Sequence, residues 1–120
     1  MDSLKIAGLN FDITWKDKER NFQNIEQQFR NITADVYVLP EMFSTGFYMY
    51  AAEIADRNTE SLNWMKTFAA KKNSAVCGSA SVFDDGRFVN RFYFVKPDGT
   101  YEFYDKRHLF TYSGEDQSYS

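Results

Sequence analysis

The sequence predicts an α/β layer fold, and two observations carry this prediction. Early in the 120 residues, strand-like apolar runs alternate with segments of helical periodicity, an order typical of parallel strands joined by helices. Later, the turn sequences Asp84-Asp85-Gly86 and Lys96-Pro97-Asp98-Gly99 separate strand-like runs, which favours antiparallel hairpins. We therefore expect a single domain in which two β-α units precede an antiparallel meander.

The first β-α unit starts at the N-terminus, where residues 4–11 have the pattern of a strand. Thr14-x-x-Asp17 resembles a capping box at the start of a helix. The apolar positions of this helix keep to one face and are Phe22, Ile25, Phe29 and Ile32. A second strand follows from Val36 to Leu39, and Pro40 ends it because proline has no N–H for the ladder.

The second unit begins after residues 44–57, which we expect to form a loop over the strand ends. Asn58 or Thr59 is expected to cap the next helix. Its inward positions are Leu62, Met65, Phe68 and Ala69. The remaining strands are expected at residues 75–82, 88–95 and 100–105.

Composition excludes several classes of partner. The formal net charge is -3 and no block of like charge occurs, which argues against nucleic acid and anionic lipid. No apolar stretch approaches the roughly 18 residues of a membrane span. Gly78 and Gly86 lack a phosphate-binding pattern, and His108 has no second histidine or cysteine nearby, so we expect neither cofactor nor metal. A single cysteine, Cys77, fits a reducing cytoplasm.

Aromatic side chains make up 18% of the chain. The runs Arg91 to Val95 and Tyr101 to Tyr104 place large apolar groups on both faces of their strands. Such strands need a covering layer on each side. We therefore expect the isolated chain to expose an apolar patch or to hide it in an intermolecular contact.

Glu41 and Lys106 are the candidate catalytic residues, because each follows an apolar strand-like run. A carboxylate and an ammonium at neighbouring strand ends can act as a general base and an oxyanion stabiliser in acyl transfer. The alternative, that both are solvated surface charges, stays open. Asn90 either hydrogen-bonds near this site or is an edge-strand polar residue. Cys77 lies among small residues in a strand, so we interpret it as a packing residue.

Together these segments resemble the nitrilase superfamily of carbon-nitrogen hydrolases, most closely its omega-amidase-like branch. The matching blocks are Ile6 to Trp15 with Asn21, Leu39 to Phe47, Asn90 to Val95, and Tyr104 to Phe110. The resemblance covers essentially the whole chain. It implies a four-layer α-β-β-α sandwich, of which residues 1–120 would be the N-terminal half and an incomplete domain.

The resemblance also implies a Glu-Lys-Cys triad. Glu41 matches the general base and Lys106 the oxyanion-stabilising lysine, while Glu115 matches, more loosely, a second glutamate near the lysine. The nucleophilic cysteine would lie beyond Ser120, so the chain alone is expected to be inactive. The implied substrate is a small linear amide, cleaved to acid and ammonia through a thioester, and we expect a homodimer.

Two rival functions stay open from the sequence. One is another branch of the superfamily, a carbamoylase or a true nitrilase. The other is a non-catalytic α/β interaction module, in which Glu41 and Lys106 are surface charges.

Overall fold

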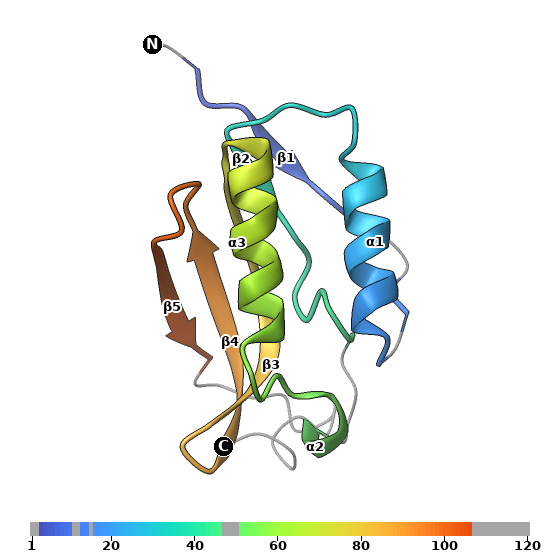
Figure 1. Cartoon of the computed structure of the whole chain (residues 1–120), viewed down its shortest axis with the longest axis vertical. Helices are drawn as coiled ribbons and strands as arrows, with labels where there is room; N and C mark the ends of the chain where they lie inside the picture. Colours follow the sequence, from blue (N-terminus) through green and yellow to red (C-terminus); the bar gives the residue numbers. More distant parts are fainter. Residues whose placement is uncertain (1–2, 11–12, 15, 47–50, 107–120) are drawn as a thin grey trace.

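A computed structural model describes residues 3–10, 13–14, 16–46 and 51–106. It contains a five-stranded sheet with the order β1-β2-β3-β4-β5 (Figure 1). The strands are β1 (Ile6–Gly8), β2 (Val36–Val38), β3 (Ala75–Asp84), β4 (Arg87–Val95) and β5 (Tyr101–Asp105). The helices are α1 (Lys18–Gln28), α2 (Ala51–Ile54) and α3 (Glu60–Lys72). None of these helices is long and apolar enough to cross a membrane.

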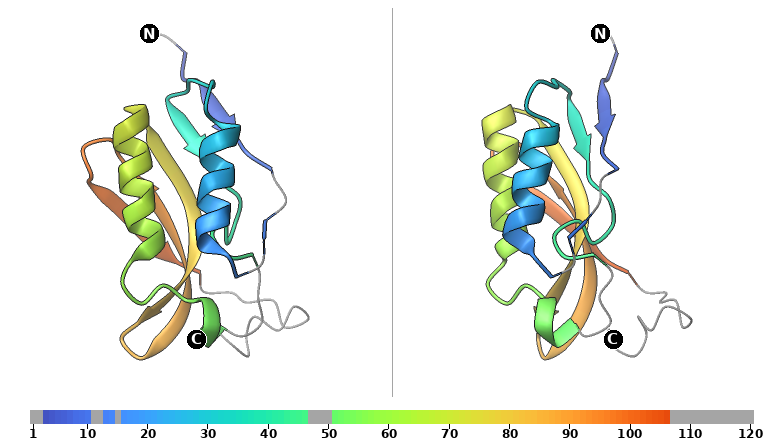
Figure 2. Two further views of the ribbon diagram at one scale, coloured as in Figure 1. Left: turned by 45° about the vertical axis from the view of Figure 1, so that its right-hand side comes forward. Right: turned by 90° about the vertical axis from the view of Figure 1, so that its right-hand side faces the viewer.

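The topology confirms the predicted α/β fold. Strands β1, β2 and β3 are parallel neighbours, whereas β3, β4 and β5 form the antiparallel meander. Helices α1 and α3 both lie on one side of the sheet (Figure 2). Two parallel crossovers followed by two hairpins therefore give a helix layer on a sheet layer.

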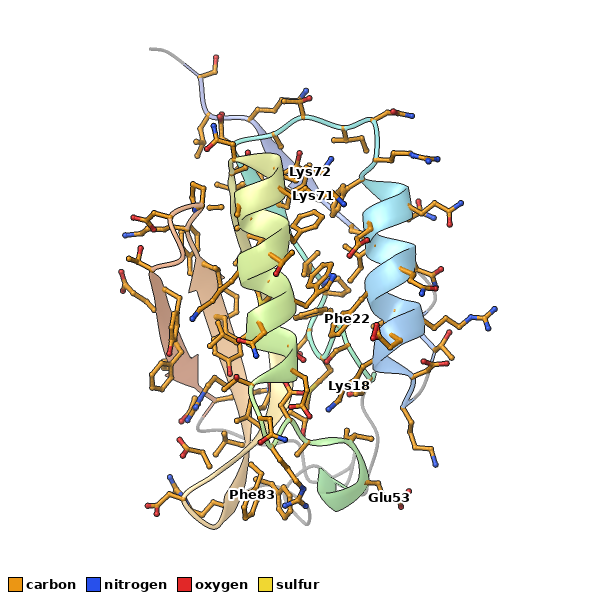
Figure 3. All side chains as sticks on the ribbon, in the orientation of Figure 1. Lys18, Phe22, Glu53, Lys71, Lys72 and Phe83 are labelled. Atoms are coloured by element: carbon orange, nitrogen blue, oxygen red, sulfur yellow. The ribbon has the colours of Figure 1, made fainter. Side chains whose placement is uncertain are left out.

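The core lies between this helix layer and the sheet. Phe22 of α1 points toward α3, where its ring stacks on Trp64 with centroids 4.9 Å apart (Figure 3). Deeper in the layer, Tyr37 of β2 packs edge-on against Phe29 and Phe68. Burying such large rings gives the strongest apolar contribution in a domain of this size, so one aromatic cluster joins both helices to the sheet.

The start and end of α1 correct two sequence-based expectations. Asp17 itself is the N-cap, since its carboxylate accepts a hydrogen bond from the Arg20 N–H at 3.1 Å. Thr14 does not cap the helix with its side chain; its carbonyl accepts from Asn21 Nδ2 instead. The helix ends before Ile32, which is 41% exposed, so placing Ile32 on the buried face was wrong.

The segment before α3 also differs from expectation. Residues 44–57 include the short helix α2 and a bridge from Asp56 to Val82, so this segment is not simply a loop. Thr59 occupies the N-cap position, but it has a left-handed backbone with φ 57° and makes no side-chain capping bond. The Ser61 N–H donates to the Asp56 carboxylate instead, at 2.9 Å. A tertiary contact thus replaces the predicted local cap.

The sheet face opposite the helices, called the open face below, carries exposed apolar side chains. Ile6, Val38, Phe92 and Tyr104 lie on it with exposed fractions of 60%, 37%, 41% and 58%. Within the described residues, no helix lies over this face (Figure 2). The exposure agrees with the expectation of an exposed apolar patch.

Candidate functional site

Glu41 lies in a turn that begins directly after β2, and β3 holds this turn in place. The Leu39 N–H donates to the Cys77 carbonyl at 2.8 Å, and the Phe43 N–H donates to the Ser79 carbonyl at 3.1 Å. Between them, the Met42 N–H donates to the Ser79 hydroxyl at 3.0 Å. These bonds fix the backbone on both sides of Glu41, so a rigid element carries the carboxylate.

Gly78 allows this turn to approach β3 closely. A Cβ atom at position 78 would lie 2.9 Å from the Leu39 Cβ and 3.1 Å from the Phe43 Cδ1. A Cβ atom does not approach another Cβ atom to 2.9 Å in real structures, so only glycine fits at position 78 without a shift of the backbone.

A buried polar network anchors the far end of the turn. The Asn21 Nδ2 donates to the Ser44 carbonyl at 2.7 Å, and the Ser61 hydroxyl donates to the Ser44 hydroxyl at 2.9 Å. Asp56 accepts from the Ser61 N–H and forms an ion pair with Lys18 at 2.8 Å. Figure 3 shows Lys18 at the start of α1, beside α3. Both helix starts therefore position the segment that follows Glu41.

Glu41, Asn90 and Lys106 converge at the open face. The Lys106 Nζ lies 3.2 Å from the Glu41 Oε2, and the Asn90 Nδ2 donates to the same oxygen at 3.1 Å. The Lys106 backbone N–H donates to the Asn90 carbonyl at 2.9 Å. The predicted proximity of Glu41 and Lys106 is confirmed. Asn90 was expected either to hydrogen-bond near the site or to be an edge-strand polar residue, and the hydrogen bond near the site is observed.

A hollow of about 360 Å³ opens beside this group. Its lining residues are Leu39, Glu41, Gly78, Ser79, Asn90, Phe92, Tyr104 and Lys106. Apolar walls with a few converging polar groups are typical of small-molecule sites. The Glu41 side chain is 43% exposed and that of Lys106 is 23% exposed, so both remain reachable from solvent.

A larger hollow of about 500 Å³ lies between α1 and α3, on the other side of the sheet. It is lined mainly by long polar side chains: Gln23, Glu26, Gln27, Arg30, Phe68, Lys71 and Lys72. The Lys72 ammonium there donates to the Phe29 carbonyl at 2.6 Å, a contact that closes the C-terminal end of α1. We place the candidate site at the smaller hollow. Among the residues that line these two hollows, an ion pair between a carboxylate and a cation is observed only for Glu41 and Lys106.

Cys77 does not line the candidate site. It is 7% exposed, lies between Val38 and Phe94 of the neighbouring strands, and burial raises the pKa of its thiol. A raised pKa disfavours the thiolate that a nucleophile needs. This burial supports the interpretation of Cys77 as a packing residue.

Glu115 and His108 lie outside the described residues. Within the described ranges, no group of three or more His, Cys, Asp or Glu residues could hold a metal ion. Sequence analysis missed the Ser79 hydroxyl as a support of the turn. The strand register points to it. Cys77 of β3 pairs with Val38 at the end of β2, and Ser79 comes two residues later, beside the turn that follows β2.

Comparisons with known proteins identify relatives. The carbon-nitrogen hydrolase family profile matches residues 5–119. The chain is 41% identical to "Omega-amidase YafV" of Escherichia coli (strain K12) over 120 residues, which covers 99% of this chain and 47% of that protein. It is 33% identical to "2-oxoglutaramate amidase" of Bacillus subtilis (strain 168), covering 88% of this chain and 43% of that protein.

Solved structures agree in fold. XC1258 from Xanthomonas campestris, described as a CN-hydrolase superfamily protein with an arsenic adduct in its active site, superposes with a TM-score of 0.93 at 29% identity. That match covers 100% of this chain and 46% of XC1258. Nit3 of Saccharomyces cerevisiae, at 21% identity and a TM-score of 0.78, shares the fold. The chain thus spans about half the length of the curated relatives it matches, and it belongs to the carbon-nitrogen hydrolase family.

Proposed function

We propose that this chain is the N-terminal half of a carbon-nitrogen hydrolase that cleaves a small linear amide to an acid and ammonia. The observation that carries the proposal is the meeting of Glu41 and Lys106 at one small hollow. The names of the relatives, omega-amidase and 2-oxoglutaramate amidase, support the choice of an ω-amide over a nitrile or a carbamoyl compound. The nucleophilic thiol would come from polypeptide beyond these residues.

Glu41 acts in this mechanism as the general base. It removes the thiol proton while the sulfur attacks the amide carbonyl. Lys106 and a backbone N–H hold the oxyanion of the tetrahedral intermediate. Glu41 then gives the proton to the amide nitrogen, which leaves as ammonia while the acyl group stays on sulfur as a thioester.

Hydrolysis of the thioester uses the same carboxylate. Glu41 takes a proton from water while the water oxygen attacks the thioester carbonyl. The C–S bond then breaks, Glu41 returns the proton to the sulfur, and the acid leaves as the thiol is restored. Lys106 holds the second oxyanion as it holds the first. Glu115, which we expect near the lysine from the family resemblance, would assist this group.

The complete polypeptide is further proposed to be a cytoplasmic homodimer. The apolar side chains on the open face need cover, which the rest of the polypeptide or a second copy can give. Light scattering of the complete protein measures its mass and tests the dimer. A monomer of unchanged activity would remove the dimer from the proposal and leave the chemistry intact.

The decisive experiment uses the complete polypeptide with 2-oxoglutaramate and measures ammonia release. The Glu41→Gln variant should lose at least about 10³-fold in kcat, because the general base is gone. Glu102→Gln is the matched control, since Glu102 is an exposed carboxylate on β5 outside the hollow.

Parallel assays with an N-carbamoyl amino acid and an aliphatic nitrile separate the three branches of the superfamily. Intact-mass measurement should detect the acyl adduct on a cysteine. If none of the three substrates reacts and no adduct forms, the non-catalytic interaction module replaces the hydrolase.

A further inference from the structure

Asn90 is a buried polar residue in an apolar strand. It is 2% exposed and sits in β4 between Phe88 and Phe92, the neighbouring positions on the same face. Directly across, β3 contributes Ser81. Burying a carboxamide costs free energy unless it is hydrogen-bonded, and the hydrogen bond from Nδ2 offsets part of this cost.

The contacts of Asn90 link the two candidate catalytic residues. Its side-chain Nδ2 donates to the Glu41 Oε2 at 3.1 Å, and its main-chain carbonyl accepts from the Lys106 N–H at 2.9 Å. Glu41 comes from the turn after β2 and Lys106 from the end of β5. Asn90, on the strand between these elements, therefore contacts both partners of the ion pair.

The two oxygens of the Glu41 carboxylate have different surroundings. Asn90 and Lys106 both contact Oε2. Oε1 accepts no hydrogen bond within the part of the chain that the structure describes. A carboxylate held by one oxygen is fixed in rotation, and its second oxygen stays available to take a proton.

We propose that Asn90 is a positioning residue for the reaction: it fixes the rotation of the Glu41 carboxylate so that Oε1 receives the thiol proton. This inference rests on the proposed hydrolase function. The Glu41 side chain is 43% exposed, so the ion pair with Lys106 alone leaves it several rotamers. Asn90 restricts that freedom, because its Nδ2 donates to Oε2 from a side chain that is buried in β4.

The size of the effect follows from the geometry of proton transfer. A displacement of about 1 Å in a reacting group can lower the rate by about 10²-fold. A residue that acts by orienting the general base changes the chemical step, so the loss should fall on kcat. The main-chain bond to Lys106 survives any substitution at position 90, which isolates the role of the side chain.

The test is a double-mutant cycle in the complete polypeptide with 2-oxoglutaramate. Asn90→Ala should lower kcat by about 10²-fold and change KM by less than about threefold. In the Glu41→Gln background, Asn90→Ala should lower kcat by no more than about twofold, because a residue that acts through Glu41 has nothing left to position. Asn90→Leu, which has a similar volume and lacks the donor, tests the same point if the alanine variant fails to fold.

Ser81→Ala is the matched control. Ser81 is 2% exposed, pairs with Asn90 across the strands, and its hydroxyl has no partner among the described residues. This variant should keep kcat within about twofold. A loss from Asn90→Ala that is equally large in both backgrounds, or shared by Ser81→Ala, would show general disruption of packing and overturn the inference. Full activity of Glu41→Gln would instead overturn the proposed function.

Discussion

Two cation–carboxylate groups lie back to back on β4 and β5, and their surroundings differ. On the open face, Lys106 contacts Glu41 beside Asn90. On the helix-covered face, Arg91 contacts Asp105. Because Asn90 and Arg91 are consecutive in β4, their side chains point to opposite sides of the sheet.

The Arg91 group makes several charged hydrogen bonds within the protein. Its Nε and Nη2 contact the two Asp105 oxygens at 2.7 and 3.0 Å, and Nη2 also contacts Asp84 at 2.8 Å. The hydrogen bonds to Asp105 are the main cause that raises the pKa of Arg91 above its ordinary value. The guanidinium also lies 4.2 Å from the centre of the Phe103 ring. Such a group ties strands together and offers little to a ligand.

The Glu41 group opens into a hollow. Its carboxylate is held through one oxygen, and its lysine has three rotatable donors around a single charge. Both groups join a cation to a carboxylate, so such a pair does not by itself identify a functional site in this sheet. What distinguishes the candidate site from the structural ion pair is that the Glu41 carboxylate borders a hollow.

Of the two groups, the one on the open face should have the larger effect on activity. Lys106→Met in the complete polypeptide keeps the length of the side chain but removes the charge that holds the oxyanion. We expect kcat to fall by about 10²–10³-fold, as for the loss of one oxyanion donor. Ammonia release with 2-oxoglutaramate measures it, and Lys96→Met, an exposed lysine after β4, is the control. A loss below tenfold would place the oxyanion contact elsewhere.

On the helix-covered face, the same kind of substitution should act on stability. Arg91→Met leaves Asp105 and Asp84 without their cation. Their side chains are 32% and 54% exposed, so solvent screens the charges left behind and we expect a loss of about 2 kcal/mol in the free energy of unfolding. The midpoint of urea unfolding of the complete polypeptide measures this loss. The kcat of the folded fraction should stay within about twofold. A drop in kcat at unchanged stability would break the distinction between the two groups.

Tyr93 gives the helix-covered face a pH dependence. Burial is the main cause that raises the pKa of Tyr93 to about 12, against an ordinary value of about 10. The folded state therefore holds the phenol proton more tightly, and stability should fall as pH rises from about 10 to 12, by about 2 kcal/mol. Urea unfolding across this range checks it. The Tyr93→Phe variant should lose this part of the pH slope, and an unchanged slope would assign it to other groups.

Cys77 gives the smallest expected effect. It lies on the open face near the site, yet it is buried and outside the hollow. Cys77→Ser should keep amidase activity within about threefold and lower the free energy of unfolding by about 1 kcal/mol, because a hydroxyl replaces a weakly polar thiol. Kinetics and urea unfolding of the same preparation test both parts. A loss of several orders of magnitude in kcat without unfolding would make Cys77 the nucleophile.

Most of the fold could be predicted from the sequence, because the strands and long helices have clear apolar periods. Ile25, Leu62 and Met65, for example, are buried as the helical spacing predicts. The ends of the helices could not be predicted as well. At the start of α3, the Ser61 N–H donates to the Asp56 carboxylate and not to the expected capping residue. Asp56 is held there by a bridge to Val82 of β3, which is distant in sequence.

The candidate site could be predicted only in part. Glu41 and Lys106 could be selected because each follows a strand, but their 3.2 Å contact depends on the sheet order. The contact of Asn90 with Glu41 depends on the side of β4 to which position 90 points, and that follows from the register with β3. The catalytic roles of Glu41, Lys106 and Glu115 stay predictions.

The tight hairpin between β3 and β4 limits how the length of this chain can change. Asp85 and Gly86 form its turn with positive φ angles of 51° and 76°, and Asp84 pairs directly with Arg87. Inserting one residue between this turn and Asn90 would turn every following side chain of β4 to the other face. Asn90 would then point into the helix layer and Arg91 toward the hollow. Viable length variants of this hairpin should therefore gain or lose residues in pairs.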